Sequence, residues 1–128
     1  MVGETDLGKL LASMQPVLDP AVYVFATCQY VPGGLEPLMI FHEAEGATLI
    51  LAESDAQAAG LDYCFACRRI TLNVHSSLDA VGFIARIASH LAAAGMGVNP
   101  VSGYYHDHLF VPADRASDAM DLLKALTL

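Results

Sequence analysis

The sequence is poor in basic residues and in cysteine. Its 128 residues include six lysines and arginines against fourteen aspartates and glutamates, for a net charge of −8. Nucleic-acid binding depends on clustered positive charge, and Arg68–Arg69 is the only adjacent basic pair. We therefore expect no nucleic-acid partner and no anionic membrane surface. Three cysteines, an odd number, argue against a disulfide framework.

Long apolar runs and common catalytic motifs are also missing. No run approaches the roughly 18 apolar residues of a membrane span. The start of the sequence carries Glu4 and Asp6 in place of the basic region of a signal peptide, so a cytoplasmic location is expected. There is no nucleophile elbow, phosphate-binding loop or HExxH motif, and we do not expect an enzyme.

The composition is that of a folded protein. Hydrophobic residues make up 55% of the chain and charged residues 16%, which excludes disorder. A chain of this length buries roughly two thirds of its surface, enough for one compact domain or two tightly fused modules. Because so much of a short chain is apolar, some apolar surface should remain for a second copy, and we expect a homodimer.

Residue periodicity predicts an α+β fold. Helical spacing marks residues 5–14, 56–59, 79–94 and the segment after Pro112, and strand patterns mark 21–29, 38–43, 47–52, 69–75, 96–103 and 107–111. The strands are short and several are joined by hairpin loops. An antiparallel sheet with helices on one face is the natural arrangement.

The second half resembles an ACT domain, a small regulatory module with a ferredoxin-like fold. The resemblance rests on the polar loop Ser76–Leu78, the following Asp79–Gly82, and Met96–Asn99 before the next strand. Across the whole chain, GETDLGKLLASMQPVL, EAEG, RRITLNVHSSLDAVGF and NPVSGYYHDHLFVP are similar to small bacterial proteins with tandem ACT-like modules, related to those of CASTOR-type arginine sensors. This implies two fused modules, residues 1–65, the more divergent, and 66–128.

One feature departs from the ACT pattern. A complete module ends in a fourth strand, but this sequence ends in or just after a helix, and its first half begins with a helix. We therefore expect a permuted or interlaced pair of modules, in which a strand from the first half completes the second sheet.

The resemblance also implies an amino-acid site near the loop between the first strand and first helix of the second module. Backbone N–H groups from Ser77 to Ala80 would hold a carboxylate, and Asp79 an amino group. Gly82 would allow close approach of a ligand or partner strand. The candidate ligand-binding residues are Ser76, Ser77, Leu78, Asp79, Val81, Gly82, Asn99, Val101, Ser102 and His106.

Purely structural roles compete at these positions. The serines and Asp79 are ordinary helix-capping residues. Gly82 is also compatible with helix packing, and Asn99, before a proline, with a turn or bulge. The segment 98–101 also fits sheet core or an interface.

Two other patterns have weaker functional interpretations. Cys64–Cys67 is a CxxC, but it precedes a predicted strand in the connection between the halves, and a second pair of zinc ligands is missing. His106 and His108 would share one face of a strand, with His75 as a possible third ligand. We expect no metal and no cofactor.

The favoured function is a non-catalytic regulatory module that binds a small molecule, an amino acid. The alternative is a ligand-free protein-interaction or oligomerisation module. A small enzyme is a third hypothesis, which would depend on His75 or His106. The sequence does not identify the ligand.

Overall fold

The computed structural model describes residues 3–127, which form two compact units. Unit 1 contains the chain up to Pro20 together with the chain from Arg68 onward, and unit 2 is Ala21–Cys67. The predicted boundary between residues 65 and 66 lies beside the change of unit after Cys67. Residues 3–20, which belong to the predicted first module, pack with the second half of the chain.

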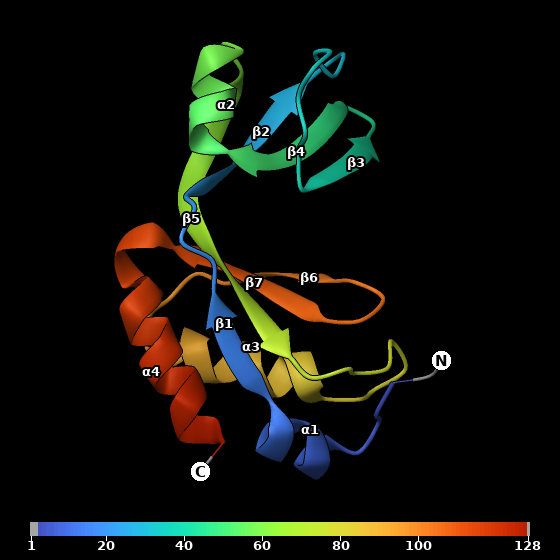
Figure 1. Ribbon diagram of the computed structural model, residues 1–128, viewed down its shortest axis with the longest axis vertical. Coiled ribbons are helices and arrows are strands. Elements are labelled where there is room, and N and C mark those ends of the chain that lie inside the picture. The colour runs from blue at the N-terminus through green and yellow to red at the C-terminus, as the bar shows by residue number, and fades with distance from the viewer. Residues whose placement is uncertain (1–2, 128) are drawn as a thin grey trace. The chain divides into compact units, whose positions relative to one another are not determined.

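Unit 1 is a sheet with helices on one face (Figure 1). Its strands are antiparallel neighbours in the order β1–β5–β7–β6, where β5 contributes only its C-terminal half. The elements are α1 (Leu7–Ser13), β1 (Gln15–Leu18), β5 (Asp62–Asn73), α3 (Phe83–Ala92), β6 (Asn99–Ser102), β7 (Asp107–Pro112), the 3₁₀ turn η1 (Ala113–Arg115) and α4 (Ala116–Leu126).

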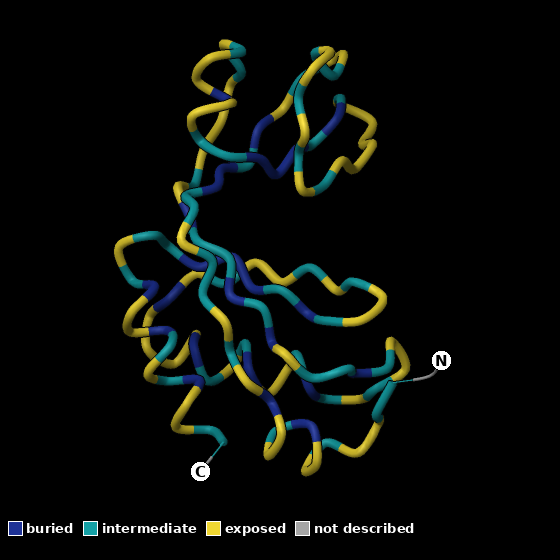
Figure 2. The backbone as a smooth tube through the Cα atoms, viewed as in Figure 1, coloured by how far each residue is buried: buried dark blue, intermediate teal, exposed yellow. Residues whose placement is uncertain are grey.

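The core of unit 1 lies between this sheet and the helices. Ile87 and Leu91 of α3 and Leu123 of α4 are fully buried against sheet residues such as Ile70 and Leu109. Buried and exposed residues alternate along both helices, as the colours in Figure 2 show. This is the pattern of helices that turn one apolar stripe to a sheet.

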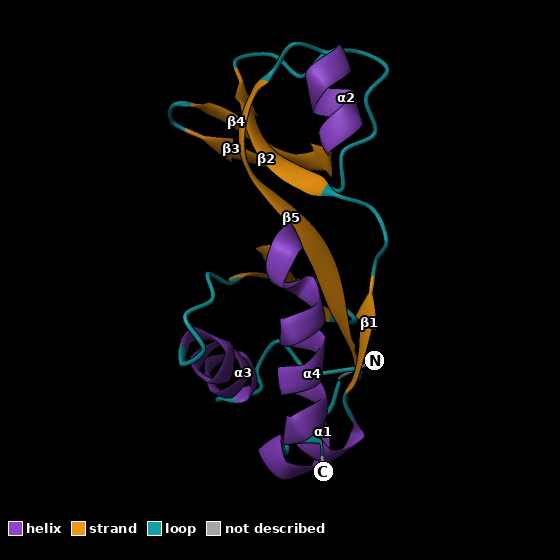
Figure 3. Cartoon of the chain, turned by 90° about the vertical axis from the view of Figure 1, so that its left-hand side faces the viewer, coloured by secondary structure: helices purple, strands orange, loops and turns teal. Residues whose placement is uncertain are grey.

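The strand missing from the second module is supplied by β1. Its residues pair antiparallel with β5, from Gln15 opposite Asn73 to Leu18 opposite Ile70 (Figure 3). The expectation of a strand donated by the first half is confirmed. Pro16 lies within this strand, and because β1 is at the edge of the sheet, the missing N–H group of proline disturbs no inner pairing.

Unit 2 has the same connectivity with fewer helices. Its strand order is β3–β4–β2–β5, with the N-terminal half of β5 at one edge. The chain runs strand, loop, strand, strand, helix, strand, so residues 29–38 replace the first helix of a ferredoxin-like module. The elements are β2 (Tyr23–Cys28), β3 (Met39–Glu43), β4 (Gly46–Ala52) and α2 (Glu53–Ala58). The predicted α+β, ferredoxin-like fold is confirmed.

The twelve-residue β5 is longer than expected, because its first part continues the sheet of unit 2. We predicted a strand only from residue 69 and a connection around the CxxC. Residues 62–64 are all exposed and show no inside–outside alternation, so their pairing with β2 has no local signal. A register shift marks a bulge, where Phe65 has φ 63°.

The helix after β5 begins later than predicted. A turn in which Ala80 N–H donates to the Ser77 carbonyl occupies the predicted start, and Gly82, with φ 89°, adopts a left-handed conformation before Phe83. A helix cannot pass through a left-handed residue, so α3 starts after it. Within residues 3–127, none of the helices has the length and apolar character required to cross a bilayer.

Candidate functional site

Unit 1 has a hollow of about 200 Å³ beside the start of α3. It is bounded by the loop from β5 to α3, the first turn of α3 and the residues at the two ends of the β6–β7 hairpin loop. The lining residues are Ser77, Leu78, Ala80, Gly82, Phe83, Ile84, Ala85, Ser102 and Asp107.

The start of α3 gives this hollow a positive end. The first N–H groups of a helix have no partner within the helix, and they lie at the positive end of its dipole. Within the described chain, no side chain caps α3 at Gly82. The backbone of Phe83, Ile84 and Ala85 can therefore donate to an anionic group in the hollow.

Asp107 gives the hollow a negative end. Its side chain is 6% exposed, and Ser76 Oγ donates to its Oδ2 at 2.9 Å. Along β7, Asp107 alternates with His108 and shares the helix-facing side with Leu109 and Val111. An anion-binding end and a carboxylate in one small hollow are the complement of a zwitterion.

The N-terminal segment fixes the loop that borders the hollow. Glu4 N–H donates to the His75 carbonyl at 2.8 Å, and Ser77 N–H donates to the Glu4 carbonyl at 2.9 Å. A Cβ on Gly3 would lie 2.6 Å from the carbonyl carbon of Ser76 and 2.6 Å from the nitrogen of Ser77. Only glycine allows this approach. This contact leaves no signal in the sequence, since nothing local connects residues 3–4 to residue 76.

The predicted ligand-binding residues divide into two groups. Ser77, Leu78, Gly82 and Ser102 line the hollow, and Ser76 bonds to its carboxylate. Outside the lining are Asp79, Val81, Asn99, Val101 and His106.

The residues outside the hollow have clear positions. Val81 is 85% exposed, and the Asp79 N–H donates to Ser77 Oγ at 3.1 Å. Asn99 and Val101 pair with Phe110 and His108, so they lie on the sheet face opposite the helices.

His106 lies in the β6–β7 hairpin loop, where its carbonyl accepts from Gly103 N–H. Asp107 and the first turn of α3 were missed as lining residues. The strand alternation that places His106 and His108 on one face also turns Asp107 to the other, and this signal was available in the sequence.

The three histidines considered as metal ligands, His75, His106 and His108, do not form a shared metal site. His108 Nδ1 lies 2.9 Å from Thr71 Oγ1, and burial, followed by the charges of Arg69 and His106, lowers the pKa of His108. The His106 and His108 ring centroids are 6.5 Å apart. Among residues 3–127, no three His, Cys, Asp or Glu side chains are grouped to hold a metal ion.

The CxxC lies within a strand, around the bulge at Phe65. Cys64 is exposed, whereas Cys67 is buried and its Sγ donates to the Tyr23 carbonyl at 3.3 Å. Burial, with a smaller contribution from Cys64, raises the pKa of Cys67 to about 12. A thiol with such a pKa stays protonated at neutral pH and is a poor nucleophile.

Comparison with known proteins identifies the family. Two family profiles, each described as an ACT domain, match residues 2–68 and 66–125. The chain therefore belongs to the ACT domain family and carries two such modules in tandem, as the sequence predicted. No match was found among curated proteins.

Solved structures agree with this assignment. A Vibrio cholerae protein of unknown function, described as a possible transport protein, is 42% identical over 95% of this chain and 96% of its own, with a TM-score of 0.87. A protein from Agrobacterium tumefaciens shares the fold at 18% identity and TM-score 0.75, covering 89% of each chain. The ligand-free regulatory subunit of aspartate kinase from Thermus thermophilus does so at 12% identity and TM-score 0.68, over 91% of this chain and 97% of that one.

The family defines a class of protein. ACT domains are regulatory, non-catalytic modules that generally bind small molecules, such as amino acids, and oligomerise. The chain is thus a regulatory ligand-binding module.

Proposed function

We propose that this protein is a non-catalytic sensor that binds a small amino acid in the unit 1 hollow. The observation that supports the proposal is that the first turn of α3, whose N–H groups have no side-chain cap, and the buried carboxylate of Asp107 both line one hollow. The α-carboxylate of the ligand would accept from the first turn of α3, and its ammonium group would pair with Asp107. Ser77 and Ser102 add hydroxyl groups.

The size of the hollow favours a small side chain. Its volume of about 200 Å³ corresponds to roughly six or seven water molecules in the liquid. Binding would shift the protein between association states with its partner, and not lead to turnover. A cytoplasmic location belongs to this proposal, and the free state of Cys28, Cys64 and Cys67 is consistent with a reducing compartment.

Thermal unfolding against the standard amino acids tests the proposal. A ligand at about 100 times its Kd stabilises the folded state by about 2.7 kcal/mol, which is a shift of several degrees in Tm. Asp107→Asn keeps the shape and an acceptor for Ser76 but removes the charge, so it should abolish a selective shift. Asp79→Asn, at an exposed carboxylate outside the hollow, is the control and should keep it.

Two results would contradict the site. One is the absence of any shift across the panel, and the other is a shift that persists unchanged in Asp107→Asn. The Tm of each variant without ligand shows whether a lost shift reflects lost folding.

A second candidate function, a self-association module, is favoured by the edge of unit 2. Among the strands that the structure describes, β3 pairs with β4 alone, which leaves its outer edge open. Ile40 and Phe41 of β3 are 45% and 62% exposed. Soluble proteins usually protect such an edge with charge, proline or a partner strand. Pairing of β3 with β3 of a second copy would provide the expected homodimer.

The mass of the protein in solution tests this second candidate. Ile40→Lys should convert a dimer to a monomer in light scattering after gel filtration, because a charged edge opposes strand pairing. Tyr30→Lys is the control, since Tyr30 is 89% exposed outside the strands. A dimer that survives Ile40→Lys, or a wild-type monomer, would contradict pairing through β3.

A further inference from the structure

The two units differ sharply in charge. All six lysines and arginines of the chain lie in unit 1, so unit 2 contains none. The acidic residues of unit 2 are Glu36, Glu43, Glu45, Glu53, Asp55 and Asp62. A surface with carboxylates and no fixed cation attracts positively charged ligands.

One face of the unit 2 sheet is covered and the other is open. Val24, Ala26 and Leu49 pack with Ala56 of α2 on the covered face. The cross-strand pairs Phe25–Cys64, Thr27–Asp62 and Thr27–Thr48 place the alternate residues together on the opposite face. No helix of unit 2 other than α2 is available to cover that face in the described residues.

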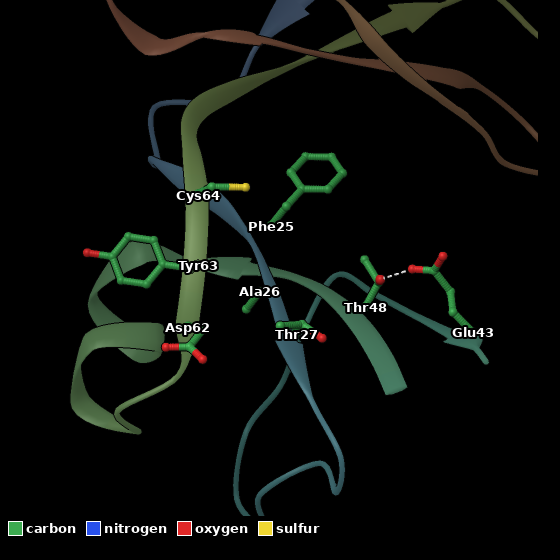
Figure 4. A pocket seen from close by; sticks show the side chains of 8 residues that line it. All are labelled: Phe25, Ala26, Thr27, Glu43, Thr48, Asp62, Tyr63 and Cys64. Atoms are coloured by element: carbon green, nitrogen blue, oxygen red, sulfur yellow. Dashed lines mark hydrogen bonds between the residues drawn. The ribbon is translucent and has the colours of Figure 1, made fainter. Parts of the chain in front are cut away.

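This open face carries a hollow of about 510 Å³ (Figure 4). That volume lies within the range of small-molecule sites, about 300–1,000 Å³. The ring of Phe25, the thiol of Cys64 and the methyl groups of Thr27 and Thr48 give it an apolar floor. Its remaining lining residues are Ala26, Glu43, Asp62 and Tyr63.

The two carboxylates stand at opposite sides of the floor. Asp62 lies on β5, at one side (Figure 4). Glu43 lies on β3, and Thr48 Oγ1 of β4 donates to its Oε1, which draws its carboxylate toward β4. Glu43 and Asp62 are on strands three spacings apart, in the order β3–β4–β2–β5, and the bond to Thr48 draws the Glu43 carboxylate part of the way back. The two carboxylates are therefore separated by about 10–14 Å. A single ammonium group cannot contact both.

We propose that this hollow binds a linear aliphatic diamine. Each ammonium group pairs with one carboxylate, Glu43 at one end and Asp62 at the other. The methylene chain between them lies on Phe25 and the threonine methyl groups. This site is separate from the amino-acid site of unit 1, so either can exist without the other.

Calorimetric titration of the whole protein with amines of different length tests the inference. We expect putrescine and cadaverine to bind about threefold to fivefold more tightly than butylamine, the contribution of one exposed charge pair at low salt. Ethylenediamine carries two charges but is too short to reach both carboxylates, so it should bind no better than butylamine. Amide shifts on putrescine addition should fall at Phe25, Thr27 and Thr48.

Variants at the two ends sharpen the test. Glu43→Gln and Asp62→Asn should each make putrescine bind only as well as butylamine. Thr48→Val keeps both carboxylates but removes the hydrogen bond that holds Glu43. It should therefore reduce, but not abolish, the preference for putrescine over butylamine. Glu36→Gln, which removes a charge of unit 2 outside the hollow, should leave the preference unchanged.

Several outcomes would overturn the proposal. These are no binding of putrescine, equal binding of ethylenediamine and putrescine, the same loss in Glu36→Gln as in Glu43→Gln, or amide shifts outside the hollow. Equal binding of all diamines would mean that the negative charge of unit 2 acts without a defined site.

Discussion

Unit 1 and unit 2 have the same strand order, but different elements cover their sheets. In unit 1, α3 and α4 cover one sheet face, and the start of α3 helps to form a polar hollow of about 200 Å³. In unit 2 a loop replaces the first helix, and the larger hollow of about 510 Å³ lies on the open sheet face instead.

This difference shows how one strand connectivity can form binding sites for two chemically different kinds of ligand. A helix start supplies backbone donors for an anion, and unit 1 also contains every lysine and arginine. The hollow of unit 2 has no helix start beside it, and exposed strand residues on the sheet face opposite α2 supply a flat apolar floor with carboxylates at its sides. Chemical labelling, substitutions and pH can each test this contrast between the two units.

Cys64 should be alkylated much faster than Cys67, by well over about tenfold, because Cys64 is exposed and Cys67 is buried with a raised pKa. The pKa of Cys67 is raised from its ordinary 9.0 to about 12, and each pKa unit lowers the thiolate fraction about tenfold. Mass spectrometry after brief exposure of the native protein to iodoacetamide measures the ratio. Similar rates for Cys64 and Cys67 would contradict the burial of Cys67.

Alkylation of Cys64 also separates the two hollows, since Cys64 lines only the one in unit 2. The labelled protein should lose putrescine binding and keep amino-acid binding.

Core truncation in either unit should destabilise the whole chain. Leu72 of unit 1 and Leu49 of unit 2 are both 0% exposed, and Leu72→Ala or Leu49→Ala should lower the free energy of unfolding by about 2–5 kcal/mol. Because β5 belongs to both units, we expect one cooperative transition in urea. Val17→Ala, at a 52% exposed position, should change little. Two separate transitions would show that the units fold independently.

Loss of the N-terminal contact should affect binding in the unit 1 hollow and leave binding in the unit 2 hollow unchanged. Gly3→Ala places a Cβ against the backbone of Ser76 and Ser77, and we expect a cost of about 1–3 kcal/mol in the free energy of unfolding. Amino-acid binding should weaken while putrescine binding is unchanged. Gly33→Ala, with no atom within 4 Å of the new Cβ, is the matched control. An unaltered stability in Gly3→Ala would mean that residues 3–4 do not hold the loop.

Acid should weaken unit 1 through His108. Its pKa is lowered in the folded state, so the unfolded chain binds a proton first as the pH falls below 6.5. Stability contributed by neutral His108 is therefore present above that pH and is lost as the pH falls toward the folded pKa. The loss stays below about 1.4 kcal/mol per unit of pKa shift, because His108 is only half-buried. Urea unfolding at several pH values should show a flatter profile for His108→Gln, and an unchanged profile would contradict this assignment.

Much of the fold could be predicted where a segment carries its own periodicity. The stripe of Ile87 and Leu91, the hairpin of β3 and β4, and the alternation in β7 are visible within a few residues. The ACT family was identified from motifs spread over the chain, and the family profiles confirm it.

The candidate site was harder to predict. Ser77, Gly82 and Ser102 do line the hollow, but its carboxylate is Asp107 and not Asp79. A helix start predicted at Asp79 placed the free N–H groups near Ser77, whereas the left-handed Gly82 moves them to the start of α3.

The sequence by itself determined the α+β class, the family, the strands and helices with a clear period, and the concentration of basic residues outside residues 21–67. These properties depend on residue identity and on spacing within one element. Only the tertiary structure decided that β1 completes the sheet of the second module, that β5 serves both units, and that Gly3 packs against Ser76. Each of these contacts joins segments that are far apart in the chain. Such backbone contacts depend on which strand edge is free, and they produce no periodic pattern in the sequence.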